Sequence, residues 1–199
     1  AMWAHQEDAG VQMLGCMAVK RLTSKVKTRR DVLRIALPSV AAVVNAMKAH
    51  PNEPIVQDKA CLALRGLASI DGEREVSFVA SGAIAAIVGA MQAHVADAAV
   101  QEEACAAIAD IVSYGGAERA TIVASVSGLT AIVNAIAAHQ NVEGVQKEGL
   151  RALAVLTEHP NANVPALPQS QTESLLDNAR KNFPQSCGEY AGMLLSRLN

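Results

Sequence analysis

Aromatic residues are scarce in this chain of 199 residues, of which phenylalanine, tryptophan and tyrosine together make up 3%. Strands favour β-branched and aromatic side chains, whereas this chain is rich in alanine, which favours helices. Charged residues are also few, at 18%, with a net charge of -2, while hydrophobic residues reach 51%. This composition is typical of a chain that buries a sizeable core and excludes intrinsic disorder. We therefore expect an all-α protein.

Familiar catalytic motifs are missing as well. The sequence has no phosphate-cradling glycine loop, no nucleophile elbow and no His-Glu-x-x-His metal motif. Gly115-Gly116 is interpreted as a turn between helices. The acidic pair Glu102-Glu103 is interpreted as helix-start carboxylates that favour the positive end of the helix dipole. We predict that the chain is not an enzyme and uses no cofactor and no small-molecule substrate.

Cysteine is limited to four residues, which form no dense disulfide framework. No secretory signal opens the sequence, so we expect a reducing, cytoplasmic location. The longest stretch without a formal charge covers residues 120–142, but it contains serine, glycine, asparagine and histidine. We expect two soluble helices there and not a membrane span.

The sequence does contain a clear tandem repeat. The pentapeptide Ala-Met-x-Ala-His, with isoleucine for methionine in its fourth copy, ends 45, 44 and 45 residues apart at His5, His50, His94 and His139. A glutamine stands seven residues after each of these histidines, at Gln12, Gln57, Gln101 and Gln146. Such a period indicates units that each form one supersecondary element and stack into a solenoid.

Each repeat unit divides into three helical segments. The third segment begins just before the glutamine, and its apolar residues trace one face of a helix, as in Val56, Ala60, Ala63, Leu64 and Leu67. The second segment is a helix that the histidine closes. Before it we expect a short first helix, roughly over residues 74–80 in one unit and 119–124 in the next.

A sharp change of direction is expected between the first and second helices. Gly82 and Gly128 stand at this point in two units, and glycine permits such corners. Pro38 is expected to mark the corresponding corner in the earlier unit, where it would fit the first turn of the helix that follows.

A unit of about 45 residues with a short helix, a corner and two longer antiparallel helices resembles the armadillo repeat. The third-helix pattern Val-Gln-x-x-Ala-x-x-Ala-Leu-x-x-Leu is found in Val56–Leu67 and, with isoleucine for leucine, in Val100–Ile111. The resemblance implies a right-handed α-α superhelix, an armadillo-like solenoid of about 4.5 repeats. HEAT repeats are the alternative, but they usually have two helices per unit, and the glycine corners disfavour them.

The whole chain, residues 1–199, is expected to form one armadillo-like domain. Its units are a partial one over 1–24, full ones over 25–69, 70–114 and 115–158, and a degenerate cap over 159–199. Because Ala1 aligns with residues inside the second helix of later units, we expect a fragment of a longer chain. In the cap, Pro160, Pro165 and Pro168 precede helices expected over 175–183 and 189–198, and Phe183 replaces the next histidine.

The repeated histidines and cysteines raise the question of a metal or redox site. Cys16, Cys61 and Cys105 each follow a glutamine by four residues. Equivalent residues of adjacent units lie about one helix-packing distance apart, roughly 8–10 Å, which is too far for a shared zinc ion or a disulfide. We predict core cysteines, no metal site, and histidines that bond carbonyls at helix ends. A histidine ladder that loosens a partner in acid is the alternative.

The ladder of glutamines is expected to tie the turn between the second and third helices, as the family pattern implies. Importin-α-like armadillo proteins carry a tryptophan five positions and an asparagine nine positions after this glutamine, and these hold a basic peptide. Here the tryptophan slots are Met17, Leu62, Ala106 and Arg151, and the asparagine slots are Arg21, Gly66, Asp110 and Val155. Binding of a nuclear-localisation peptide in that manner is therefore not expected.

The same slots should still face the concave groove of an armadillo array. The candidate protein-binding groove consists of Met17, Arg21, Leu62, Arg65, Asp110 and Arg151. A groove that is merely solvated is the alternative interpretation.

Basic residues cluster between positions 20 and 34, where Asp31 is the single acid. Together with Arg21, the candidate basic patch consists of Lys20, Lys25, Lys27, Arg29, Arg30 and Arg34. Such a patch suits an acidic protein, an anionic lipid surface or nucleic acid, but no aromatic residue within it could stack on a base. A solvated turn and helix is the alternative, and among partners we prefer an acidic protein.

These observations together favour a non-catalytic scaffold that presents a concave surface to a protein partner. The first alternative is a structural subunit packed inside a large assembly, and the second is a basic-patch binder of anionic lipid or nucleic acid. Histidine-ended units also look similar to armadillo arrays in large multidomain proteins, including the leucine-rich-repeat kinases. That likeness transfers no activity.

Overall fold

The computed structural model describes residues 1–25, 29–71, 78, 81–159 and 169–198. Every element within these residues is helical, which confirms the all-α prediction. The elements are η1 (Met2–Ala4), α1 (Ala9–Thr23), α2 (Arg29–Ala49), α3 (Pro54–Asp71), α5 (Ala83–Ala93), α6 (Ala98–Ser125), α7 (Gly128–Ala138), α8 (Glu143–Thr157), α9 (Gln169–Asn182) and α10 (Pro184–Leu198).

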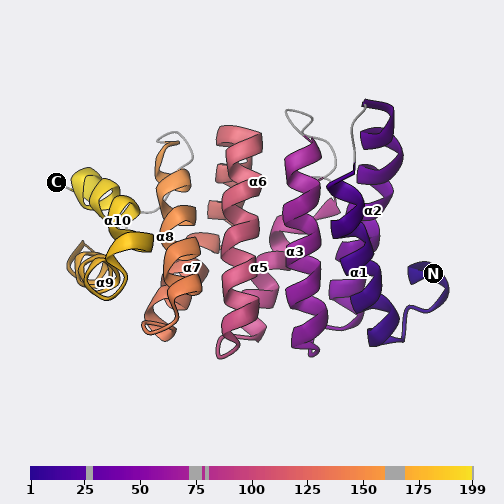
Figure 1. Cartoon of the computed structure of the whole chain (residues 1–199), viewed down its shortest axis with the longest axis horizontal. Coiled ribbons are helices and arrows are strands. Elements are labelled where there is room, and N and C mark those ends of the chain that lie inside the picture. Colours follow the sequence, from indigo (N-terminus) through magenta and orange to yellow (C-terminus); the bar gives the residue numbers. More distant parts are fainter. Residues whose placement is uncertain (26–28, 72–77, 79–80, 160–168, 199) are drawn as a thin grey trace.

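The helices stack in two layers along one long axis (Figure 1). One layer consists of α1, α3, α6, α8 and α10, each of which packs against the next. The second layer consists of α2, α5 and α7, which also follow one another in sequence order. Units that are neighbours in the sequence are therefore neighbours in space, and the chain is an armadillo-like solenoid.

The core repeats with the same period as the sequence. In α3 the predicted apolar face, from Val56 to Leu67, is completely buried, and the equivalent residues of α6 are buried too. The second-layer helices contribute their own apolar faces, which include Ile84 and Ile87 in α5. The core is thus a continuous band between the two layers, as the periodicity predicts.

The glutamines fix the turn between the two layers in each of the four histidine-ended units. The Gln57 Nε2 donates to the carbonyl oxygens of Met47, at 3.0 Å, and His50, at 2.7 Å. Gln101 makes the same pair of bonds to Met91 and His94, both at 2.8 Å. Gln12 and Gln146 repeat the arrangement. This confirms that the glutamine ties the end of the second helix to the start of the third.

The histidines connect successive units, which the sequence analysis did not predict. Each caps the second helix through its backbone N–H, as His94 does with Ala90. The rings of His50, His94 and His139, however, bond the preceding unit and not their own helix. The Nε2 atoms of His50, His94 and His139 lie 2.7 to 2.8 Å from the backbone oxygens of Gln6, Pro51 and Val95. Each of these oxygens belongs to the residue that follows the previous unit's repeated histidine, so the rings form a ladder of links between units.

The predicted glycine corners are correct in one unit and wrong by one residue in the next. Gly82 precedes α5 with a left-handed backbone, φ 72°. In the next unit the left-handed residue is Ser127, φ 62°, and not Gly128. Gly128 has a different role, because a Cβ atom there would lie 2.8 Å from the carbonyl oxygen of Val123. Its small size permits the close approach of two backbones.

The predicted corner at Pro38 is also wrong. Pro38 lies inside α2, which runs without interruption from Arg29 to Ala49. A proline inside a helix removes one backbone hydrogen bond and crowds the carbonyl of the preceding turn, yet α2 extends on both sides of Pro38. A break does occur at Gly116, between the third helix of one unit and the first helix of the next. Its φ of 64° and ψ of -153° divide α6 into two helical parts, in agreement with the turn predicted at Gly115-Gly116.

Two further expectations concern the remaining segments. The short helix predicted over 74–80, apart from Phe78, and the prolines at 160, 165 and 168 lie outside the described residues. In the predicted cap, both helices are present but begin earlier than expected, at Gln169 and Pro184. Among the described residues, no single helix is long and apolar enough to cross a membrane, although the bent pair of α6 and α7 meets that test by length and composition.

Candidate protein-binding surface

The predicted groove residues come from the helices of the first layer. Met17 and Arg21 belong to α1, Leu62 and Arg65 to α3, Asp110 to α6 and Arg151 to α8. We call the solvent-facing side of these helices the third-helix face. Arg21 is exposed on it, and the other five side chains are half-buried. The structure brings three of the six into direct contact.

Asp110 links three consecutive units through its two carboxylate oxygens. The Oδ2 atom accepts a hydrogen bond from Arg65 Nε at 2.8 Å, and the Oδ1 atom accepts one from Arg151 Nη1 at 2.6 Å. Arg151 also donates to the Ala106 carbonyl of α6 at 3.2 Å. The three charges that the sequence analysis assigned to a partner therefore contact one another.

Two carboxylates that the sequence analysis did not place in the groove complete this ion-pair network. Arg151 Nε donates to Glu148 Oε2 at 2.7 Å, and Arg65 Nη1 lies 3.5 Å from Glu103 Oε2. The spacing of Glu148 and Arg151, three residues apart on one helix, was a signal that could have revealed the first pair. Glu103 was interpreted only as a helix-start residue.

The surroundings of the network shift three pKa values. Burial acts to lower the pKa of Arg65 and of Arg151. The hydrogen bond to Asp110, together with the charges of Asp110 and the neighbouring glutamates, outweighs burial, so both pKa values are raised. Burial raises the pKa of Glu103, although the charge of Arg65 opposes the shift. The guanidinium groups thus stay charged and engaged, whereas the Glu103 carboxylate is incompletely compensated.

The N-terminal part of the third-helix face differs from this network. Lys20, Arg21 and Lys25 form no ion pair with any residue that the structure describes. Met17 of α1 and Leu62 of α3 are half-buried on this face. The Lys20 stem passes close to Gly66, where a Cβ atom would lie 2.9 Å from its Cδ. We call Met17, Lys20, Arg21, Lys25 and Leu62 the α1–α3 surface.

The predicted basic patch is only partly visible. Lys20 is half-buried and Lys25 is exposed beside the end of α1. Arg29, Arg30 and Arg34 begin α2, but their side chains, like the whole of Lys27, lie outside the described residues. The structure therefore places Lys20 and Arg21 on the last turn of α1 and Lys25 just beyond its end.

The outer side of α1 exposes residues of a type that is buried elsewhere. Leu22 is 47% exposed, whereas the residues in the same slot of the next three units are 0 to 1% exposed, namely Leu67, Ile111 and Leu156. Leu14, on the same helix, is 60% exposed. Each inner helix of the first layer packs between two other first-layer helices. Within the described residues, α1 has a first-layer neighbour, α3, on one side only. We call Leu14, Ala18 and Leu22 the α1 end face.

The three repeat cysteines are core residues, as predicted, and Cys187 is buried as well. Cys16, Cys61, Cys105 and Cys187 are all buried and unpaired. Burial raises the pKa of the Cys16 and Cys105 thiols to about 12 and that of Cys187 to about 11. Thiols with such values carry almost no thiolate at neutral pH and are weak nucleophiles and ligands. No group of three or more potential metal ligands occurs among the described residues.

A buried arginine in the second part of α6 was not anticipated. Arg119 is 0% exposed, donates to the Ile111 carbonyl at 3.2 Å, and lies with its guanidinium 5.3 Å from the Phe78 ring centroid. Gly115 makes room for it, since a Cβ atom there would lie 2.0 Å from the arginine Cδ. Arg74, 45 residues earlier, was the available signal. The contacts of Arg119 are structural and do not create a site.

Comparison with known proteins supports the architecture. No match was found among curated proteins or among solved structures. A model of one protein family, described as the LRRK2 ARM repeat, matches residues 1–183. The match covers the four histidine-ended units and most of the last one. With its stacked three-segment units and its glutamine-tied turns, this chain belongs to the LRRK2 ARM repeat family.

Proposed function

We propose that the chain is a non-catalytic scaffold that binds an acidic, partly apolar protein segment on the α1–α3 surface. Armadillo-type repeats generally serve protein interactions, which supports the broad assignment. The observation that supports this particular surface is that the cations at one end of the third-helix face form no ion pair with a described residue, whereas those further along it do. Arg65 and Arg151 are engaged by Asp110, whereas Arg21 and Lys25 are exposed without an ion pair to any described residue.

The physical reason lies in what each part of the face can offer a partner. A carboxylate that approached Arg65 or Arg151 would have to displace Asp110, which already holds both groups at hydrogen-bond distance. Arg21 and Lys25 have no ion-pair partner among the described residues that an approaching carboxylate would need to displace. Met17 and Leu62 supply neighbouring apolar area, which gives most of the affinity of such contacts. We therefore propose a partner with carboxylates flanking one or two apolar side chains.

Charge reversal on the α1–α3 surface tests this proposal. The variant R21E/K25E removes two exposed cations of this surface, and R180E/K181E removes two exposed cations of α9 with the same change in net charge. The probe is a fluorescent peptide of alternating glutamate and leucine residues, followed by anisotropy. We expect R21E/K25E to weaken binding at least about tenfold and R180E/K181E to change it by less than about twofold.

Two outcomes would count against the α1–α3 surface. Equal weakening by both variants would show attraction to overall charge without a defined site. Tighter binding of phosphatidylserine vesicles or of an oligonucleotide, lost in R29E/R30E and falling steeply with salt, would favour the lipid or nucleic-acid alternative. Unchanged behaviour of R29E/R30E toward both probes would eliminate that alternative.

The α1 end face supports a second candidate function, a structural unit within a larger assembly. Leu14 and Leu22 are exposed at positions where this fold otherwise buries apolar residues. Crosslinking mass spectrometry of complexes isolated from cells separates the two candidates. Crosslinks that include Lys59 of α3 favour the scaffold on the third-helix face, whereas crosslinks confined to the end helices of the array, Lys20 of α1 included, favour the assembly. The four unpaired cysteines support a proposed reducing, cytoplasmic location for either candidate.

A further inference from the structure

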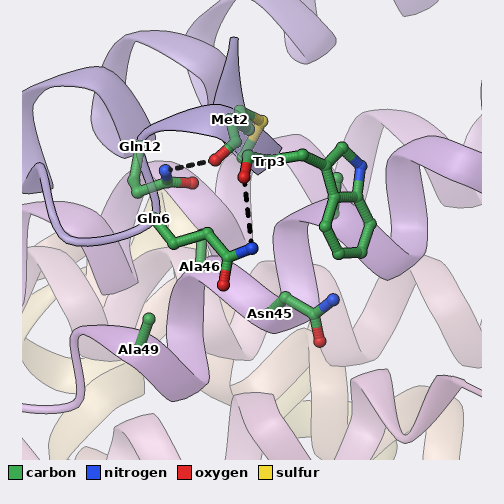
Figure 2. A pocket seen from close by; sticks show the side chains of 8 residues that line it. Met2, Trp3, Gln6, Gln12, Asn45, Ala46 and Ala49 are labelled. Carbon is green, nitrogen blue, oxygen red and sulfur yellow. Dashed lines mark hydrogen bonds between the residues drawn. The ribbon is translucent and has the colours of Figure 1, made fainter.

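Two equivalent clefts lie on either side of α2. The first lies between η1 and α2 (Figure 2), and the second between α2 and α5. Their lining residues occupy the same slots of successive units, 44 or 45 residues apart. Examples are Met2 and Met47, Gln12 and Gln57, and Ala46 and Ala90. The same cleft therefore occurs in two successive units, and the two copies differ in the residues at a few equivalent positions.

The two clefts differ in how much of their space is filled. Trp3 and Asn45 line the first cleft, and Figure 2 shows the indole of Trp3 beside Asn45. The same slots of the second cleft hold Lys48 and Gly89. The open volume is about 10 Å³ in the first cleft and about 240 Å³ in the second. The aromatic side chain of Trp3 thus lines the first cleft, which has little open volume, whereas the second cleft has no aromatic residue in this position and is open.

The lining of the second cleft is suited to an apolar group. Met47, which is 3% exposed, contributes a thioether, and Ala86 and Ala93 of α5 contribute small side chains. Both N–H groups of Gln57 are already donated, to Met47 and His50, so the amide offers no free donor. Methionine sulfur makes favourable contacts with aromatic rings.

Size and charge narrow the occupant further. A cavity of about 150 Å³ can hold benzene, whereas drug-sized ligands need about 300–1,000 Å³, so the second cleft fits one large side chain. Lys48 is exposed at its edge and forms no ion pair with a described residue. Its ammonium group can pair with a carboxylate next to the inserted side chain.

We propose that the cleft between α2 and α5 binds one aromatic side chain of a protein segment, flanked by a carboxylate that pairs with Lys48. This site is formed by α2, α5 and the turn that leads to Gln57 of α3, and it shares no residue with the α1–α3 surface. It goes beyond the proposed function, and either site can fail without the other.

The chain itself supplies the variant that closes the cleft. Asn45 and Asn134 stand in the slot of Gly89 in the neighbouring units, so G89N restores the residue of its neighbours. A Cβ atom at Gly89 meets nothing within 4 Å, and the backbone there is helical, so the fold accommodates the change. Gly192 of α10 is likewise an exposed helical glycine with nothing within 4 Å of a Cβ atom. The variant G192N is the matched control.

The binding experiment uses protein with ¹³C-labelled methionine methyl groups and the peptide acetyl-Asp-Trp-Asp-amide. We expect the Met47 methyl resonance to shift on titration, while that of Met193 in α10 stays in place. G89N should weaken binding at least about tenfold, since it removes the burial of an aromatic ring, and G192N should leave it unchanged. K48E should weaken binding by about fivefold, in keeping with a surface ion pair.

Comparator peptides decide the chemistry of the occupant. Replacing tryptophan by alanine should abolish the Met47 shift, and replacing both aspartates by lysine should weaken binding. The proposal is overturned if Met47 does not respond to the tryptophan peptide, or if G89N and G192N bind it equally. Equal binding of a peptide with leucine in place of tryptophan would overturn the aromatic assignment.

Discussion

Arg151 of α8 donates a hydrogen bond of 2.6 Å to Asp110 of α6, although 41 residues separate them in the sequence. The same carboxylate accepts a bond from Arg65 of α3. We expect D110N to lower the free energy of unfolding by about 1–2 kcal/mol, because it removes the charge that compensates two partly buried guanidinium groups.

A double-mutant cycle of D110N with R151A isolates the pair. We expect a coupling energy of about 0.5–2 kcal/mol in urea denaturation. Residual exposure of both side chains keeps the value below that of a fully buried pair. Strict additivity of the two substitutions would show that the contact contributes nothing to stability.

Gln101 should be one of the polar residues on which stability depends most. It is 1% exposed, and its Nε2 satisfies the carbonyl groups of Met91 and His94. We expect Q101A to lower the free energy of unfolding by about 2–3 kcal/mol, since it leaves both carbonyls without this donor. Q140A, at an exposed turn, is the control and should change it by less than about 0.5 kcal/mol. Similar losses in the two variants would contradict this role.

The histidine ladder predicts that loss of a histidine ring lowers the free energy of unfolding only where the ring contacts a preceding unit. The ring of His94 bonds the Pro51 carbonyl of the preceding unit, whereas His5 is exposed and its ring makes no hydrogen bond to a described residue. We expect H94A to lower the free energy of unfolding by about 1 kcal/mol and H5A to leave it nearly unchanged. If thermal unfolding does not distinguish the variants, the ring contact between units is unimportant for stability.

Glu103 predicts a pH dependence with a definite sign. Its pKa in the folded chain is raised, first by burial, so folding favours its protonated form. The stability that this contributes is fully present below the pKa of the unfolded chain and is lost as the pH rises through the folded-state value. E103Q remains neutral and should therefore lose less stability than the parent chain between about pH 4 and pH 8.

Thermal unfolding of both proteins across this range provides the measurement, with E118Q as a control at an exposed position. If E103Q instead became progressively less stable than the parent as the pH rose, the pairing of Glu103 with Arg65 would outweigh the effect of burial. The sign of the difference, and not its size, decides between the two.

The repeat period was sufficient to predict most of the fold. Residues such as Val56, Ala60 and Leu67 are buried in every inner unit because each third helix packs against the same kind of neighbour. The glutamine turn was predictable for the same reason. The contacts of the candidate groove residues could not be predicted in the same way. The slots of Asp110 and Arg151 follow from the repeat, but whether their charges contact a partner or each other depends on side-chain reach across units.

The direction of the histidine rings was unpredictable on similar grounds. Sequence periodicity places His94 at the end of a helix, and both its own helix and the preceding unit offer carbonyl acceptors there. Only the spacing between units decides which acceptor the Nε2 atom can reach, and the Pro51 oxygen lies at 2.8 Å. A repeat unit considered alone does not contain that information.

Ser127 adopts a left-handed backbone conformation that glycine would adopt more readily. Its φ of 62° is unfavourable for a residue with a side chain, and Gly82 occupies the equivalent slot one unit earlier. We expect S127G to raise the free energy of unfolding by about 0.5–1 kcal/mol, because relief of this conformation exceeds the entropy that glycine loses on folding.

The reverse change and a nearby control complete the test in chemical denaturation. G82A should destabilise the fold by about 1 kcal/mol through backbone conformation alone, because a Cβ atom there meets nothing within 4 Å. S125G, at the end of α6, should also be destabilising, since glycine there weakens a helix. Opposite signs for S127G and S125G, two residues apart, would identify the left-handed corner as the cause. Destabilisation by S127G would show instead that contacts of the serine side chain hold this corner together.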